Sequence, residues 1–176
     1  EKRGITKTIK IGRLVVSLND SLEVETRDRA LVFRKHGLEC AVSPELLVPE
    51  GARGNVQLAY YLDNEILVVA LADDSGSSFP ISAFDKKDGD LMWRSTVWGN
   101  LTAESGQFGT GAFWHNFQID REKDRIRVWG ESGPAYFEEL SLSKGECRFR
   151  FSTCCWYGRR YAELYGKLIP GYEQGD

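Results

Sequence analysis

The chain has 176 residues, of which 41% are hydrophobic and 28% are charged, a balance that predicts one soluble domain with a substantial core. Its 23 basic and 26 acidic residues give a formal net charge of −3, which argues against a nucleic-acid partner because such binders are basic or carry a basic stripe. No apolar run approaches the roughly 18 residues of a membrane-spanning helix, so we expect no membrane partner either.

Short runs of β-forming residues separated by turns predict strands in the first part of the chain. Apolar and polar residues alternate loosely over residues 9–18, which predicts one strand, and further strand-like runs cover 22–26, 30–33 and 38–42. Turn-forming residues separate these runs, among them the sequence Lys35-His36-Gly37. Together the four runs predict an antiparallel unit over residues 7–43.

Two further groups of strands follow, each after a segment rich in Gly or Pro. Residues 44–55 predict a loop with a short helical turn at 45–47, and residues 99–111 predict a second loop. The strand groups themselves cover residues 56–96 and 112–152. In the last segment, residues 156–168, aromatic and apolar side chains recur at helical spacing and predict a helix; they are Tyr157, Tyr161, Leu164, Tyr165 and Leu168.

The second and third groups contain an internal repeat. When Gly89 is set on Gly145, 56 residues later, Trp93 aligns with Phe149. A strand, a tight turn closed by glycine and a strand with a large aromatic residue are typical of the outer hairpin of a four-stranded blade. A single blade cannot bury both of its faces, so we expect the copies to stack, with each aromatic residue packed against the neighbouring blade.

The sequence Ala-Phe-Asp-Lys-Lys-Asp-Gly-Asp-Leu-Met-Trp-Arg at residues 83–94 resembles the repeat of quinoprotein-like (PQQ-like) β-propellers, with Asp88 where that family usually has Thr. The second copy departs further, because Ser141 replaces the Asp and Phe149 replaces the Trp. The resemblance covers about a third of the chain and implies a blade-like unit. It carries over no quinone site, because no quinone-binding residues can be matched, and we predict no cofactor.

These observations predict an all-β fold in a single domain, residues 1–176, made of antiparallel four-stranded blade-like repeats with a C-terminal helix. Three units are fewer than the four to eight blades of closed propellers. The alternatives are therefore an open arc of three sheets, assembly with another copy, or two packed sheets that share only the hairpin motif.

The sequence shows no catalytic constellation, and we predict no catalytic residue and no metal site. His36 is expected to be an exposed turn residue, and His115 a partly buried one. The carboxylates between Asp73 and Asp90 are expected to shape turns. The alternative is a small-molecule- or metal-binding enzyme that uses these carboxylates or the pair His115 and Cys154.

The four cysteines are too few and too irregularly spaced for a disulfide scaffold. We expect reduced thiols in a bacterial protein, with a Cys40–Cys147 or Cys147–Cys154 bridge as the alternative. Cys154 and Cys155 are adjacent, and adjacent cysteines rarely pair with each other. The first residues do not lead into the apolar stretch of a signal peptide. This favours a cytoplasmic location, or a periplasmic or secreted one if a signal peptide has been removed.

Candidate partner-binding residues come from the aromatic and basic content. Trp98 begins a Gly-rich loop, and an aromatic and arginine cluster opens the expected helix; its members are Trp156, Tyr157, Arg159, Arg160 and Tyr161. Trp, Tyr and Arg are enriched among the residues that anchor protein interfaces. The sequence therefore predicts a non-catalytic protein-interaction module, such as an immunity or inhibitor protein with a cognate protein partner. A structural unit of a larger β assembly is a further alternative.

Overall fold

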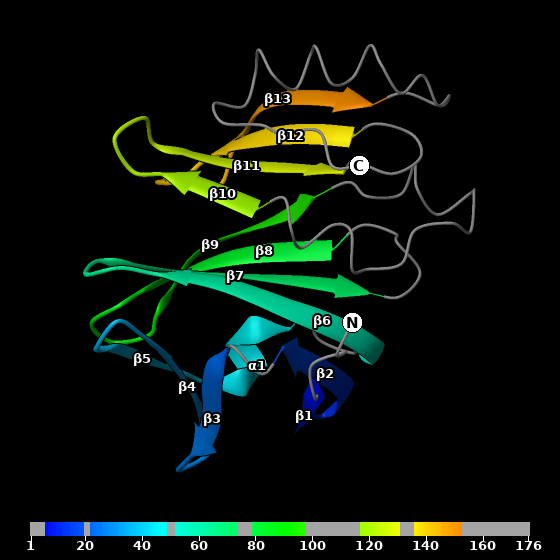
Figure 1. Cartoon of the computed structure of the whole chain (residues 1–176), viewed down its shortest axis with the longest axis vertical. Coiled ribbons are helices and arrows are strands. Elements are labelled where there is room, and N and C mark those ends of the chain that lie inside the picture. The colour runs from blue at the N-terminus through cyan, green and yellow to red at the C-terminus, as the bar shows by residue number, and fades with distance from the viewer. Residues whose placement is uncertain are drawn as a thin grey trace, which may run out of the picture.

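The computed structural model describes residues 6–19, 22–48, 52–73, 79–97, 117–130 and 136–152. Over these ranges the chain forms three β-sheets that are stacked face to face (Figure 1). The first sheet has the order β3-β4-β5, the central sheet β1-β2-β6-β7-β8-β9 and the terminal sheet β10-β11-β12-β13. The predicted all-β fold is confirmed, whereas the predicted helix 156–168 lies outside the described residues.

The strands of each sheet have the following bounds. The first sheet contains β3 (Glu23–Arg27), β4 (Ala30–Lys35) and β5 (Leu38–Val42). The central sheet contains β1 (Thr6–Ile11), β2 (Arg13–Asn19), β6 (Arg53–Leu62), β7 (Ile66–Asp73), β8 (Phe79–Asp85) and β9 (Leu91–Val97). The terminal sheet contains β10 (Phe117–Asp120), β11 (Arg125–Gly130), β12 (Tyr136–Ser141) and β13 (Cys147–Ser152).

The segment predicted as one strand over residues 9–18 is two strands instead. The chain reverses at Gly12, where φ is +59°, so that β1 and β2 form a hairpin with Ile11 opposite Leu14. This hairpin joins the central sheet through a parallel pairing of β2 with β6 and does not extend the first sheet. Only β3, β4 and β5 therefore form the first sheet.

The short helix α1 (Pro44–Leu47) links the first sheet to the central sheet. It confirms the helical turn predicted at 45–47. Pro44 occupies its first turn, where a missing N–H costs no hydrogen bond. Leu47 is buried in the core. Among the described residues no helix is long and apolar enough to cross a membrane.

The central sheet is covered on both faces, which explains why β7 is apolar over six consecutive positions, 66–71. One core lies between the central and first sheets and includes Leu67, Val69 and Phe33. The other core lies between the central and terminal sheets and includes Val68 and Ile126. Alternate residues of β7 thus contribute to different cores, as the period of two in a strand requires.

The internal repeat predicted from the glycine offset is confirmed by the backbone of the two hairpins. Gly89 donates its N–H to Asp85 O and Gly145 donates to Ser141 O, both at 2.8 Å. Their φ angles are +76° and +70°, in the left-handed region that favours glycine. Both hairpins also shift register at the same place, at 83/84 in β8 and at 139/140 in β12. The offset is 56 residues in every case.

Each of these glycine turns is seated on the outer strand of the preceding sheet. A Cβ atom at Gly89 would overlap the carbonyl oxygen of Ala41 in β5, and one at Gly145 would overlap the ring of Trp93 in β9. Trp93 in turn donates its indole N–H to Leu142 O at 2.9 Å. The prediction that Trp93 packs against the neighbouring unit is therefore confirmed, and glycine is needed because the sheets approach too closely for a side chain.

Candidate functional site

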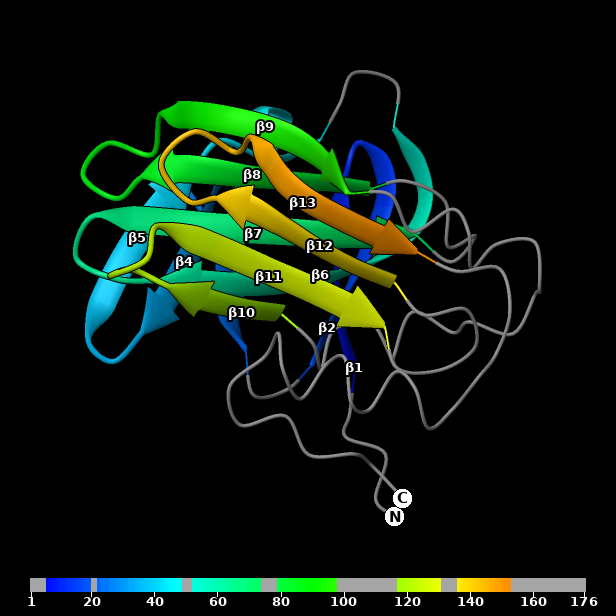
Figure 2. The ribbon, with the colours of Figure 1, turned by 90° about the horizontal axis from the view of Figure 1, so that it is seen from above.

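The predicted partner-binding residues lie outside the described part of the chain, but the strands that lead into them are described. The set is Trp98, Trp156, Tyr157, Arg159, Arg160 and Tyr161. β9 ends at Val97, directly before Trp98, and β13 ends at Ser152, four residues before Trp156. β9 and β13 are equivalent outer strands of the two four-stranded repeats, and both point toward the same side of the stack (Figure 2).

The histidine and cysteine candidates are separated or lie beyond the described ranges. His36 is exposed in the β4–β5 turn, with a φ of +50°, as predicted. Cys40 is a buried thiol in the first core, and burial raises its pKa to about 11, so it is protonated at neutral pH. Cys147 lies on β13, across the central sheet, so a Cys40–Cys147 bridge does not form. His115, Cys154 and Cys155 fall outside the described residues.

The described carboxylates of the central sheet shape its turns. Asp85 Oδ1 accepts the N–H of Lys87 at 2.8 Å, and Asp88 Oδ1 accepts the N–H of Asp90 at 3.1 Å. Over the described ranges no three His, Cys, Asp or Glu side chains gather to hold a metal ion. For Asp85 and Asp88, the turn role that the sequence favours is the observed one.

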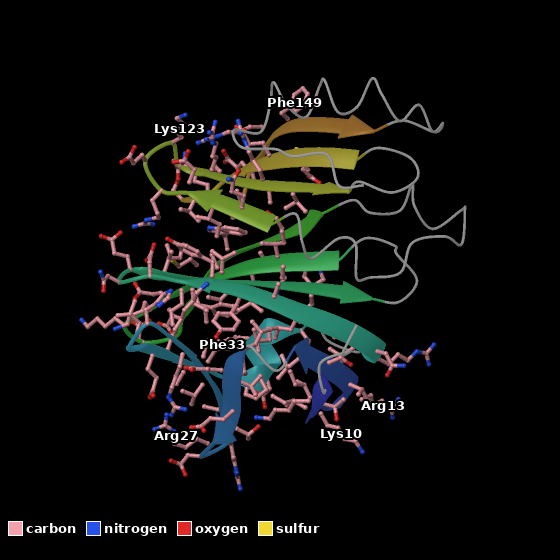
Figure 3. The ribbon with its side chains drawn as sticks, in the orientation of Figure 1. Lys10, Arg13, Arg27, Phe33, Lys123 and Phe149 are labelled. Atoms are coloured by element: carbon pink, nitrogen blue, oxygen red, sulfur yellow. The ribbon has the colours of Figure 1, made fainter. Side chains whose placement is uncertain are left out.

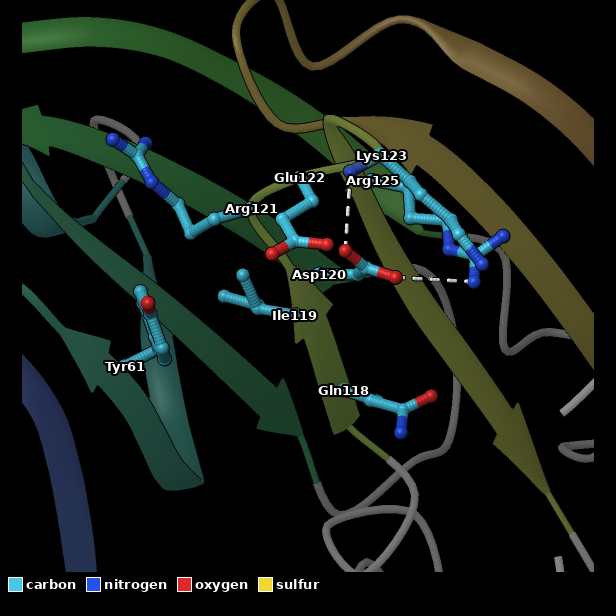
Figure 4. A pocket seen from close by; sticks show the side chains of 8 residues that line it. All are labelled: Tyr61, Gln118, Ile119, Asp120, Arg121, Glu122, Lys123 and Arg125. Carbon is cyan, nitrogen blue, oxygen red and sulfur yellow. Dashed lines mark hydrogen bonds and ion pairs between the residues drawn. The ribbon is translucent and has the colours of Figure 1, made fainter. Parts of the chain in front are cut away.

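A pocket of about 460 Å³ lies between β6 and the edge of the terminal sheet, and sequence reasoning missed it. Tyr61 of β6 borders one side, and residues of β10, β11 and the turn between them border the other (Figure 4); they are Gln118, Ile119, Asp120, Arg121, Glu122, Lys123 and Arg125. The only signal in the sequence is six consecutive charged residues at 120–125, a pattern typical of a solvated turn.

Hydrogen bonds hold the titratable groups at one end of this pocket in fixed charge states. Tyr61 donates its hydroxyl to Asp63 Oδ2 at 2.9 Å, and Arg121 Nε lies 3.1 Å from the same oxygen. Burial raises the pKa of Tyr61 to about 12, and the bond to Asp63 adds to the shift. Burial acts to raise the pKa of Asp63 as well. The net pKa of Asp63 is nevertheless lowered, because its carboxylate accepts hydrogen bonds from the backbone N–H groups of Glu65 and Ile66 and from the Tyr61 hydroxyl, and because Arg121 is positively charged.

Asp120, at the other end of the pocket, is an ionised acceptor too. Its Oδ1 accepts the N–H of Lys123 at 3.1 Å, and its Oδ2 pairs with Arg125 Nη2 at 3.1 Å. The backbone bond from Lys123, with the charge of Arg125, lowers the pKa of Asp120. Tyr61 thus stays a donor and Asp120 an acceptor at neutral pH, and neither has the pKa near 7 that a general acid or base needs. The pocket is suited to hold a polar group in place.

The outward faces of the two end sheets are chemically different. On the first sheet, four side chains form a ladder of ion pairs in which Arg34 bonds both Glu25 and Glu39, at 2.7 and 2.8 Å, and Arg27 bonds Glu39 at 2.7 Å. Arg27 is 46% exposed. Because these pairs lie in water, they contribute little to stability and make this face soluble. Figure 3 shows Arg27 at the opposite end of the molecule from Phe149.

On the terminal sheet, the outward face carries a charged pair that is largely buried. Arg127 Nε bonds Glu139 Oε2 at 3.0 Å, and the two side chains are only 9% and 20% exposed. The Nη1 atom of Arg127 is buried and makes no hydrogen bond. Phe149 lies opposite Glu139 in the register and is 45% exposed. The side chains of Arg127 and Glu139 are thus shielded from water, whereas Phe149 beside them is exposed.

Comparison with known proteins gives a weak structural likeness and no family. No protein-family model matches the chain, and no curated protein matches it. Among solved structures, the quinohemoprotein alcohol dehydrogenase from Comamonas testosteroni is similar with a TM-score of 0.38 and 12% sequence identity. The match covers 73% of this chain and 26% of that enzyme, so this chain spans about a quarter of the enzyme's length. This is a weak similarity of structure and establishes no family.

Proposed function

We propose that this chain is a non-catalytic protein-interaction module of the immunity or inhibitor type. The observation that carries the proposal is that β9 and β13, which lead into the predicted contact residues, are equivalent strands pointing the same way. Trp98 comes directly after β9, and the cluster at 156–161 begins four residues after the end of β13. Trp, Tyr and Arg are the usual anchors of a protein interface.

The charge state of the described pocket also supports binding over catalysis. Asp63 and Asp120 are held ionised by hydrogen bonds, and Tyr61 is held protonated. Groups fixed in these states can hold a partner's polar side chain, but they do not exchange protons near neutral pH.

The proposal is tested by photo-crosslinking from two positions of the full chain. A photoreactive phenylalanine analogue at position 98, and separately at position 156, should capture the same protein from the native cell. Replacing the two arginines in the double variant Arg159→Ala/Arg160→Ala should weaken binding of that protein about 30-fold, the cost of losing one interface hot spot.

The matched control is Arg27→Ala/Arg34→Ala, which removes two arginines from the exposed face of the first sheet. This control should leave the affinity unchanged, because that face belongs to the first sheet, which contributes neither of the strands that lead into the predicted contact residues. Capture of unrelated proteins from positions 98 and 156, or an equal loss of affinity in the control, would refute the proposal.

The pocket favours a second candidate, a binder of small polar ligands. Its described lining offers a phenol, an amide and charges of both signs around a space of about 460 Å³. If this function holds, ligands with a carboxylate or a phosphate should raise the melting temperature, and Gln118→Leu should reduce the effect. An unchanged melting temperature across such a panel would leave the pocket as a surface feature.

A further inference from the structure

The repeat places two carboxylates of the terminal sheet at the positions of two that hold an arginine in the central sheet. One row of the register in the central sheet is Tyr61, Val68, Ala83 and Trp93. The matching row in the terminal sheet is Gln118, Arg127, Glu139 and Phe149. Two residues after the first member of each row stands an aspartate, Asp63 or Asp120. Two residues after each aspartate stands a glutamate, Glu65 or Glu122.

The pair in the central sheet binds a guanidinium group. Arg121 Nε lies 3.1 Å from Asp63 Oδ2, and Arg121 Nη2 pairs with Glu65 Oε2. Arg121 belongs to the turn between β10 and β11, so the arginine at this site comes from the sheet that is stacked next. Two carboxylates that bind two different nitrogens of one guanidinium fix its orientation as well as its charge.

The hydrogen bonds of the two aspartates show where they differ. Each aspartate uses its Oδ1 atom for backbone N–H groups of its own turn. Asp63 Oδ2 has two side-chain donors, the hydroxyl of Tyr61 and the guanidinium of Arg121. Asp120 Oδ2 has the Nη2 atom of Arg125 at 3.1 Å. Among the residues that the structure describes, Asp120 Oδ2 thus has one donor fewer than its counterpart, and it can accept another.

Glu122 completes the terminal pair. Its side chain is exposed, and none of the described side chains forms an ion pair with its carboxylate. Asp120 and Glu122 both border the pocket of about 460 Å³ (Figure 4). The terminal sheet therefore presents two carboxylates, spaced in the sequence as the central pair is, next to a space that a side chain can enter.

We propose that Asp120 and Glu122 form a binding site for an arginine side chain of a protein partner. The guanidinium chemistry follows from the repeat, whereas the assignment to a protein rests on the proposed function. Arginine fits better than lysine because the central pair contacts two separate nitrogens. The net charge of −3 also favours a cationic occupant. Because Arg125 already neutralises part of the charge of Asp120, we expect the isolated site to bind weakly.

The test is a titration of the full chain with N-acetyl-arginine amide, whose guanidinium is its only charge, followed by NMR of the amide resonances. The probe should shift the resonances of Gln118 and of the β10–β11 turn, and N-acetyl-lysine amide should bind about fivefold more weakly. Glu122→Gln should weaken binding of the arginine probe about fivefold, the upper value for one exposed ion pair. The matched control Glu146→Gln, which removes the same charge from another exposed turn of this sheet, should leave binding unchanged.

The variant Arg121→Ala provides a positive control in the same molecule. Without this arginine, the carboxylates of Asp63 and Glu65 lose their guanidinium partner. The probe should then bind there as well and shift the N–H resonances of Glu65 and Ile66. A probe that binds at this central site but not at the terminal pair would overturn the proposal.

The other outcomes also separate the proposal from its alternatives. Equal binding of the two probes, or equal losses in Glu122→Gln and Glu146→Gln, would overturn it, because cations would then be attracted to the surface in general. Tighter binding of acetate or inorganic phosphate at Gln118 would overturn it in favour of the small-ligand pocket. Shifts at Gln118 on dilution of the protein alone would overturn it in favour of a second copy. None of these measurements involves a partner, so the photo-crosslinking test of the proposed function can fail or succeed independently.

Discussion

The close contact of Gly145 with the ring of Trp93 allows a quantitative prediction about how the sheets are held together. In Gly145→Ala, the new Cβ atom would lie 2.5 Å from Cδ2 of the Trp93 ring and 2.8 Å from Ser95 Oγ, both too close for any real contact. Alanine would also be strained at a φ of +70°, which costs about 1–2 kcal/mol. Forcing the two sheets apart adds about 1–3 kcal/mol, the usual cost of overpacking a core.

Comparison with the variant Gly37→Ala separates the cost of the clash between the sheets from the cost of the backbone strain. Gly37 has a similar φ of +78°, but nothing lies within 4 Å of the position its Cβ would take. Both variants therefore carry the backbone strain, and only Gly145→Ala carries the clash. We expect urea denaturation, followed by tryptophan fluorescence and circular dichroism, to show Gly145→Ala losing about 1–3 kcal/mol more than Gly37→Ala. Equal losses would show that the close contact between β9 and the β12–β13 turn does not hold the sheets together.

Three further predictions concern the charged and titratable groups. The pKa of Tyr61 is raised to about 12, so the contribution of the protonated phenol to stability is complete below about pH 10 and is lost as the pH rises from about 10 to about 12. Tyr61→Phe should therefore flatten the decline of the unfolding free energy over that range. The lowered pKa of Asp63 has the opposite sign, so its contribution is present above the unfolded pKa and is lost as the pH falls below about 4, and Asp63→Asn should reduce this acid sensitivity in urea titrations. Glu139→Leu alone should cost about 3 kcal/mol because it leaves Arg127 buried and unpaired, whereas the double variant with Arg127→Leu should be close to neutral; a double variant as unstable as the single one would contradict this reasoning.

The parts of the fold that local patterns encode could be predicted from the sequence. The two hairpins around Gly89 and Gly145 were predictable because a turn that needs a positive φ restricts the residue type, and the outer strand carries an aromatic residue at a fixed distance. The helical turn at 45–47 was also predicted, and Pro44 lies in its first turn, where proline is favoured. Each of these signals lies within a few residues of the structure it specifies.

The parts that depend on distant neighbours could not be predicted. The apolar positions over residues 9–18 change from odd to even at Gly12, a local sign of the reversal that the one-strand prediction overlooked, but nothing local shows that β2 pairs in parallel with β6. The pocket was missed for the same reason, because it forms where Tyr61 meets a turn 60 residues later, and the run of charged residues in that turn is equally typical of a solvated turn. The burial of Arg127 was hidden as well, since a charged residue in a strand predicts a solvated face.

A stack of sheets must end on both sides, and the two ends of this one differ for a physical reason. On the first sheet, the end face carries Arg27, Arg34, Glu25 and Glu39 in mutual ion pairs with access to water, so the face needs no cover. On the terminal sheet, Arg127 and Glu139 pair with little access to water, so the loss of either partner alone leaves the other charge poorly solvated. Phe149, opposite Glu139 in the same row, is 45% exposed. The two end faces of the stack therefore differ in chemistry, with ion pairs open to water on the first sheet and a shielded ion pair beside an exposed aromatic ring on the terminal sheet.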